Sequence, residues 1–123
     1  MSKPTVAMLG ACADSDKFGN KSVRAHLAQG YEVYPVNPRG GTIEGLEVYR
    51  TIGEVPVDRL DRVSVYLPPK IGVTVLDEVA AKGCGELWLN PGSDDPMVVE
   101  RARELELEVI VACSIVDVES RGS

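Results

Sequence analysis

Short segments rich in glycine, proline and asparagine follow the apolar runs of this 123-residue chain, and their residue types could bind a ligand. The first segment, Gly10-Ala11-Cys12, ends one apolar run and precedes an amphipathic one. Backbone N–H groups at such a junction, with the positive end of a helix, attract a phosphate group. The dinucleotide-binding glycine pattern is not met, because Cys12 and Ser15 stand where glycines are needed. Gly10 alone therefore leaves phosphate binding and a plain strand-to-helix turn equally open.

The segment Asn37-Pro38-Arg39 follows the second apolar run. Many nicotinamide-binding domains place a carboxylate there to hold a ribose. An amide can hydrogen-bond a ribose hydroxyl without repelling a phosphate, and Arg39 can bind phosphate oxygens as a fork. The residue types favour a ligand with a phosphorylated ribose, a class that includes NADP and coenzyme A. Such residues are also common in turns, so a simple turn is the alternative.

Two further segments, Pro68-Pro69 and Asn90-Pro91-Gly92, have a rigid backbone with few donors. They could line a dry cleft for a flat ring or an acyl arm. From composition alone we favour their reading as strand ends. We expect the only histidine, His26, to pack within the fold or to face solvent rather than to react, and Trp88 to lie in the core.

The elements that would position these segments alternate along the chain. Apolar runs predict strands, and amphipathic spacing predicts helices over 18–29, over 70–82 and after Ser93, with Ser93 as N-cap and Pro96 in the first turn. The predicted strands span residues 5–11, 31–37, 62–67, 86–90 and 108–112. The second of these helices has apolar residues at helical spacing, namely Ile71, Val75, Leu76 and Val79. The predicted inward stripe of the third consists of Val99, Ala102 and Leu105.

Strands that alternate with helices require crossover connections and a parallel sheet covered on both faces. The sequence therefore predicts an α/β fold: one Rossmann-like, doubly wound domain over residues 1–123 with a five-stranded, mainly parallel sheet. Pro35 indicates an irregular or one-sided ladder for its strand. The stretch from residue 38 to Val55 should hold at most a short strand and one helical turn. Ligands of such folds bind beyond the carboxyl ends of the strands.

The formal charge of −6 is unevenly distributed. Residues 1–50 hold six basic and five acidic residues, a net of +1, and residues 51–123 hold seven and fourteen, a net of −7. This balance speaks against nucleic acid and anionic membranes as partners, but not against one compact phosphate ligand near the N-terminal half. The three cysteines have no paired spacing, which favours a reducing compartment. The sequence also shows no signal peptide and no apolar run of membrane length, so we expect a cytoplasmic protein. A single histidine makes a metal site unexpected.

Five motifs in order, from about Val6 to Cys113, resemble the CoA-binding domain family, stand-alone proteins similar to the N-terminal domain of the succinyl-CoA synthetase α subunit. They are Val6–Cys12, Gly30-Tyr31 with Tyr34–Pro38, Gly45 with Tyr49, Val65–Pro69, and Leu87–Gly92, followed by Cys113. The resemblance implies coenzyme A or an acyl-CoA as ligand. It places Gly10, Ala11 and Cys12 at the pyrophosphate and Asn37, Pro38 and Arg39 around the adenosine and its phosphate. Pro68, Pro69 and Asn90 would line the rest of the cleft, and Lys17 completes the candidate binding residues.

Two positions depart from the family pattern. Cys12 replaces the usual serine, and Val111-Ala112 replace the Asp-Arg often found before the last cysteine. Succinyl-CoA synthetase also uses a phosphohistidine in a second domain and an ATP-grasp partner, which these residues do not supply. We therefore expect a non-catalytic module that binds CoA or an acyl-CoA. The alternatives are an NADP-dependent enzyme or nucleotide-sensing regulator, and an interaction subunit with a vestigial cleft. The acyl group, the protein partner and the oligomeric state are left open by the sequence.

Overall fold

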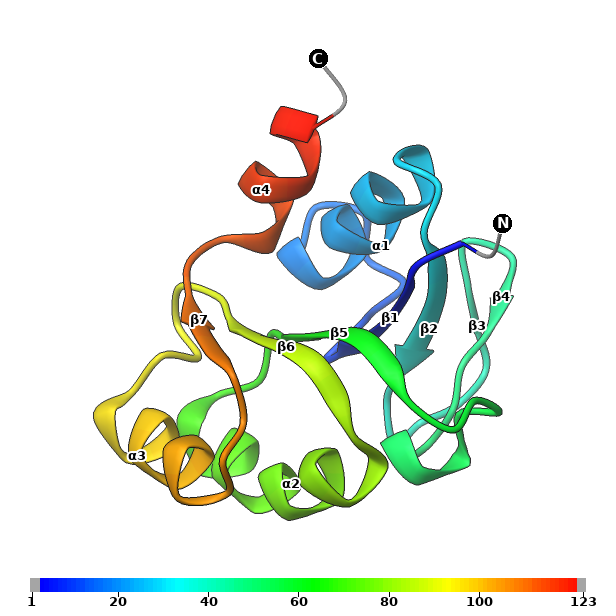
Figure 1. Cartoon of the computed structure of the whole chain (residues 1–123). Helices are drawn as coiled ribbons and strands as arrows, with labels where there is room; N and C mark the ends of the chain where they lie inside the picture. The colour runs from blue at the N-terminus through cyan, green and yellow to red at the C-terminus, as the bar shows by residue number, and fades with distance from the viewer. Residues whose placement is uncertain (1–2, 122–123) are drawn as a thin grey trace.

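The computed structural model describes residues 3–121 and shows a parallel five-stranded sheet between two layers of helices (Figure 1). The strand order is β2-β1-β5-β6-β7. The chain first runs from β1 outward to β2 and then returns past β1 to β5, so the strand order reverses between β1 and β5. The strands are β1 (Thr5–Leu9), β2 (Glu32–Val36), β5 (Leu60–Val65), β6 (Cys84–Leu89) and β7 (Val109–Val111). The predicted α/β Rossmann-like fold is confirmed.

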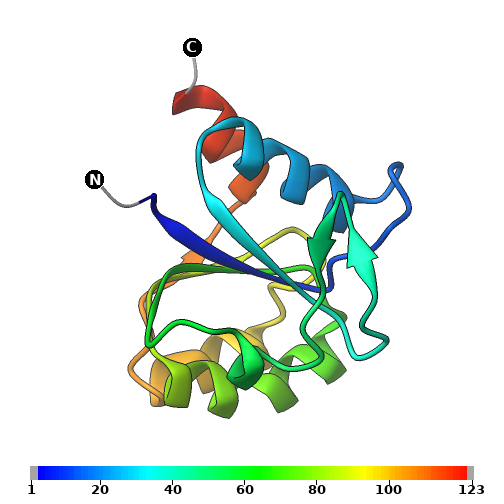
Figure 2. The same ribbon diagram turned by 90° about the vertical axis from the view of Figure 1, so that its right-hand side faces the viewer.

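Four helices cover the two faces of this sheet. Helices α1 (Phe18–Ala28) and α4 (Ser114–Arg121) pack together on one face, and α2 (Pro69–Lys82) and α3 (Pro96–Glu104) pack together on the other (Figures 1 and 2). Val23 and Val118 are fully buried on the first side, and Leu76 and Ala102 lie in the core of the second. Because both faces are covered, β1 reads as a continuous apolar run rather than an alternating one.

Pro35 lies in β2, at the edge of the sheet. Its carbonyl accepts the Tyr49 N–H at 3.0 Å on the side away from β1, so the missing N–H also falls outside the β1–β2 ladder. The one-sided ladder expected from Pro35 is confirmed, apart from one parallel bridge between Val36 and Tyr49.

The connection from β2 to β5 holds more structure than expected. It forms a hairpin of β3 (Thr42–Ile43) and β4 (Leu46–Glu47), then a 3₁₀ turn, η1 (Ile52–Glu54). Glu44 and Gly45 both have positive φ, at 51° and 79°, as a two-residue hairpin loop requires. Glu-Gly is a weaker turn signal than Asn-Gly or Asp-Gly, which explains why two short strands stand where at most one was expected.

One expectation about the helices on the second face, the N-cap of α3, was wrong. Asp95, not Ser93, caps α3: its Oδ1 accepts the Met97 N–H at 2.9 Å. Ser93 instead donates its hydroxyl to the Leu67 carbonyl at 2.7 Å, which joins the ends of β5 and β6. Ile71 is half exposed, because it lies in the first turn of α2, beyond the edge of the sheet.

The inward stripe of α3 and the end of the chain also differ from expectation. Val98 and Ala102 are fully buried, whereas Val99 and Leu105 are only partly buried against the core. Helix α4 was not expected, since its eight residues are preceded by no strong capping or turn signal in the sequence. Its first residue, Ser114, is fully buried.

Candidate functional site

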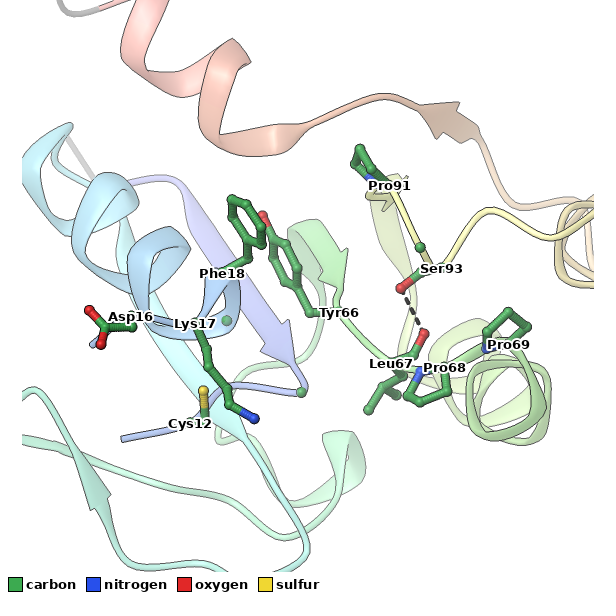
Figure 3. A pocket seen from close by; sticks show the side chains of 13 residues that line it. Cys12, Asp16, Lys17, Phe18, Tyr66, Leu67, Pro68, Pro69, Pro91 and Ser93 are labelled. Carbon is green, nitrogen blue, oxygen red and sulfur yellow. Dashed lines mark hydrogen bonds between the residues drawn. The ribbon is translucent and has the colours of Figure 1, made fainter. Parts of the chain in front are cut away.

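A cleft of about 590 Å³ opens at the carboxyl edge of the sheet, where the strand order reverses between β1 and β5. Lys17 and Cys12 lie on one side of it and Pro68, Pro69 and Ser93 on the other, with Phe18 and Tyr66 between them (Figure 3). Parallel sheets bring strand ends and helix starts to the same edge, which is why residues distant in sequence meet there.

Two glycines shape the loop between β1 and α1. Gly10 has a φ of +86°, and a Cβ there would lie 2.5 Å from the Tyr66 carbonyl oxygen. A Cβ on Gly19 would lie 2.5 Å from the Gly10 carbonyl oxygen. Both positions therefore require glycine, and their contact seats the start of α1 directly against the end of β1.

The first turn of α1 lies in the cleft without a side-chain cap. Lys17 is the N-cap residue, its backbone is extended, and its side chain makes no capping hydrogen bond. The first turn contains no acidic residue, and the Asp16 carboxylate points away from the centre of the cleft (Figure 3). The positive end of the helix and the Lys17 ammonium group thus both favour an anion at this side of the cleft.

Asn37 builds the loop after β2. Its Nδ2 donates to the Ala11 carbonyl at 2.9 Å, and its Oδ1 accepts the Arg39 N–H at 2.9 Å. Asn37 therefore ties the ends of β1 and β2 together and folds the Pro38–Arg39 turn. Arg39 is exposed, and within residues 3–121 its guanidinium has no hydrogen-bond or ion-pair partner.

A second, smaller cavity of about 180 Å³ lies beside the cleft. Gly10 and Leu67 line both hollows, so the two are adjacent. Its other lining residues come from the ends of β1 and β2, the segment around η1 and the start of α2: Leu9, Val36, Pro38, Arg50, Thr51, Ile52, Ile71, Val75 and Glu78. Cleft and cavity together make a groove with an anion-attracting end and a mainly apolar end.

The structure brings most of the predicted binding residues to this groove. The cleft itself is lined by five of them, Gly10, Cys12, Lys17, Pro68 and Pro69. Pro38 lines the adjoining cavity, with Asn37 and Arg39 next to it in the same loop. Ala11 is fully buried, and its carbonyl accepts the hydrogen bond from the Asn37 side chain instead of facing the cleft.

Asn90 does not line the cleft, which corrects the sequence expectation. It is fully buried, and its Nδ2 donates to the Ser64 hydroxyl and the Val65 carbonyl, each at 2.9 Å. Its Oδ1 accepts both the N–H and the hydroxyl of Ser114, at 2.8 and 3.0 Å. The amide therefore fastens β6 to β5 and to the start of α4, and it has no remaining capacity for a ligand.

The sequence did not single out several residues that line the groove. Tyr66 lies in the cleft, and its hydroxyl is 3.1 Å from the Ser114 Oγ; burial raises its pKa. Phe18 stands at the rim with 64% of its surface exposed. In the sequence, an aromatic residue at the predicted start of the first helix is the signal that could indicate such a rim position.

His26 lies in the interior of the fold, whereas Cys12 lies in the cleft. His26 is fully buried, and desolvation lowers its pKa to about 4. Cys12 is half-buried in the cleft, with its Sγ 3.9 Å from the Asp14 carbonyl oxygen. Across residues 3–121, no three His, Cys, Asp or Glu side chains gather as metal ligands would.

None of the helices in the described part of the chain combines the length and apolar character needed to cross a bilayer.

Comparison with known proteins agrees with this geometry. The chain is 30% identical over 115 residues to a trans-feruloyl-CoA synthase from an unknown prokaryotic organism, a match that covers 88% of this chain and 16% of the relative. It is 32% identical over 81 residues to the acetate–CoA ligase [ADP-forming] II subunit alpha of Pyrococcus furiosus, covering 63% of this chain and 17% of the relative. The chain thus spans about a sixth of the length of these relatives.

A solved structure of similar size has the same fold. It is the cell-free ID.343 protein from Thermus thermophilus, which superposes with a TM-score of 0.85 at 32% identity and covers 97% of this chain and 90% of its own. The family model described as CoA binding domain matches residues 4–119, nearly the whole chain. The chain belongs to the CoA binding domain family.

Proposed function

We propose that this protein binds coenzyme A or an acyl-CoA in the groove at the carboxyl edge of the sheet, without catalysing a reaction on it. The observation that carries the proposal is the contact between Gly10 and Gly19, which sets the uncapped start of α1 against the end of β1. A pyrophosphate fits such a site, because unsatisfied N–H groups and the helix dipole attract negative charge. The family to which the chain belongs supports CoA as the molecule that supplies it.

We place the remaining parts of the ligand along the rest of the groove. The adenosine would lie toward Asn37, Pro38 and Arg39, beside the smaller apolar cavity. The pantetheine arm would run past Pro68 and Pro69, where rigid backbone offers few competing N–H groups. The groove is lined by two carboxylates, Asp16 in the cleft and Glu78 in the smaller cavity, so neither hollow holds a carboxylate pair that could move a proton, which supports binding rather than catalysis.

Isothermal titration calorimetry with CoA tests the proposal directly. We expect one molecule of CoA per chain, a rise in melting temperature with CoA concentration, and weaker binding of dephospho-CoA. Absence of both heat and stabilisation at millimolar CoA would refute the proposal.

Replacing Lys17 tests the anion-binding end of the groove. We expect Lys17→Ala to weaken CoA binding roughly three- to tenfold, because an exposed cation next to a phosphate contributes a charge-assisted hydrogen bond. Lys3→Ala removes the same charge at the opposite edge of the sheet, before β1, and should leave the affinity unchanged. Equal effects of the two substitutions would show that Lys17 does not contact the ligand.

The same titrations distinguish the other functions that the residue types allow. An NADP-dependent enzyme or nucleotide-sensing regulator requires NADPH, rather than CoA, to raise the melting temperature. An interaction subunit with a vestigial cleft requires that neither ligand binds.

A further inference from the structure

Two arginines reach the loop after β2 from separate parts of the chain. Arg39 belongs to the loop itself, and Arg50 follows the β3–β4 hairpin. The pairing of Tyr49 with β2 sets the position of Arg50. Tyr49 N–H donates to the Pro35 carbonyl at 3.0 Å, and Asn37 N–H donates to the Tyr49 carbonyl at 2.9 Å. Arg50 therefore leaves the sheet at the same edge as Asn37 and Arg39.

The Arg50 side chain lies over the backbone of this loop. A Cβ on Gly40 would lie 3.3 Å from the Arg50 Nε and 3.7 Å from its Cζ, so the absence of a side chain at Gly40 leaves room for the guanidinium. Arg50 also lines the smaller cavity together with Pro38. The guanidinium thus lies where the loop meets the apolar end of the groove.

Neither guanidinium is neutralised by a carboxylate. Within residues 3–121 neither Arg39 nor Arg50 forms an ion pair, whereas Arg62 and Arg101 both do. The hydrogen bond from Arg50 to the Glu54 Oε1, at 3.2 Å, uses the backbone N–H. Two unpaired cations on one loop attract an anion that carries more than one charge.

Two nearby carboxylates limit where that anion can lie: Glu54, whose Oε1 accepts the Arg50 backbone N–H, and Glu78. Glu78 lines the smaller cavity and would repel an anion deep inside it. The favourable place is therefore the mouth of the cavity, against the loop that holds Arg39 and Arg50.

We propose that Arg50 joins Arg39 in binding the phosphate on the ribose of the ligand and makes the protein select a phosphorylated ribose. Each planar guanidinium can offer two parallel N–H donors to phosphate oxygens. The proposal rests on the proposed function, since it places the adenosine of the ligand at this loop. It adds a specificity determinant, Arg50, that lies outside the motifs of the sequence.

The test compares CoA with dephospho-CoA, which lacks only the ribose phosphate. Both are titrated into the unaltered protein, Arg50→Gln and Arg59→Gln. Arg59 is an exposed arginine just before β5, at the opposite edge of the sheet, so its replacement removes the same charge away from the groove. We expect Arg50→Gln to weaken CoA binding about tenfold and dephospho-CoA binding by less than about twofold. Arg59→Gln should change neither.

Further variants and ligands separate the possible failures. Arg50→Lys keeps the charge without the fork, so its preference for CoA should be intermediate, and thermal unfolding without ligand checks that each variant is folded. Equal loss for both ligands in Arg50→Gln, or a response equal to that of Arg59→Gln, would overturn the role of Arg50 while leaving CoA binding intact. If the unaltered protein binds NADP in preference to both NAD and CoA, the result supports the role of the two arginines in binding a ribose phosphate and refutes CoA as the ligand. If neither CoA nor NADP binds, both proposals fail.

Discussion

Arginine serves opposite purposes in two regions of this molecule. Arg62, on β5, has only 1% of its surface exposed, and the structure surrounds its guanidinium with partners. Its Nη2 lies 2.9 Å from the Asp117 Oδ2 and 3.2 Å from the Glu86 Oε1. The same group lies over the rings of Tyr31 and Trp88, and its Nη1 is 3.4 Å from the Nε2 of His26. This cluster joins α1, β5, β6 and α4.

Arg39 and Arg50 are both exposed at the carboxyl edge, and within residues 3–121 neither guanidinium forms an ion pair with a carboxylate. The comparison teaches how to separate structural from ligand-binding cations in a small fold. A buried guanidinium with all its partners supplied by protein stabilises, whereas an exposed one on a rigid loop keeps its hydrogen bonds for a ligand. Substitutions in the first region should change stability, and those in the second should change affinity.

The largest effect is expected from Arg62→Met. It removes the cation that lies between Asp117 and Glu86 and leaves the two partly buried carboxylates facing each other, so the free energy of unfolding should fall by about 3 to 5 kcal/mol. Denaturant unfolding measures the loss, and CoA affinity of the folded variant should stay within about twofold.

Arg101→Gln is the matched control for this substitution. Its ion pair with Asp77 is exposed, and such pairs contribute at most about 1 kcal/mol. A loss in Arg62→Met no larger than that of Arg101→Gln would contradict the structural role of the buried cluster.

The next effect is the pH dependence of stability that His26 confers. Burial lowers its pKa from 6.5 to about 4, and its Nδ1–H donates to the Ser22 carbonyl at 2.8 Å, so the folded state holds the neutral ring. Between these two values the unfolded chain binds a proton that the folded protein does not. This contribution to stability is therefore complete above pH 6.5 and is lost as the pH falls toward 4, by up to about 3 kcal/mol.

Replacing His26 with glutamine isolates this contribution. His26→Gln keeps a hydrogen-bonding side chain but cannot titrate, so unfolding curves measured from pH 7.5 to 4 should show a smaller loss than in the unaltered protein. Parallel curves for the two proteins would show that His26 does not titrate differently in the folded and unfolded states.

The smallest effect is expected in the cleft, from Cys12→Ser. The substitution restores the hydroxyl that the family usually has at this position, so CoA should bind roughly two- to fivefold more tightly. Cys113→Ser, outside the residues that line the groove, should change nothing. Weaker CoA binding in Cys12→Ser would indicate that the thiol itself contributes to the site.

Local pattern was enough to predict the sheet and the edge at which the ligand site lies. The apolar run through β1 and the helical spacing after Pro69 place those elements within a few residues of their observed bounds. Both signals are contained in short stretches of sequence. The glycines and prolines that follow β1, β2, β5 and β6 then mark the carboxyl edge.

What sequence could not supply were contacts between distant segments. Asn90 resembled a cleft residue because it follows a strand, but its side chain is used by Ser64 and Ser114. Arg50 gave no signal, because only the pairing of Tyr49 with β2 brings it beside Arg39. In each case the role depends on a partner more than ten residues away.

The contact between Gly10 and Gly19 also bears on how this site can change over evolutionary time. The atoms that exclude a methyl group at these positions are carbonyl oxygens, of Tyr66 and of Gly10 itself. No side-chain substitution elsewhere can remove a main-chain oxygen, so neither glycine has a compensating partner mutation. Cys12, between them, is free to vary in chemistry. Evolution can therefore change the side chain that this loop presents to a ligand, but the path of the loop backbone should stay the same.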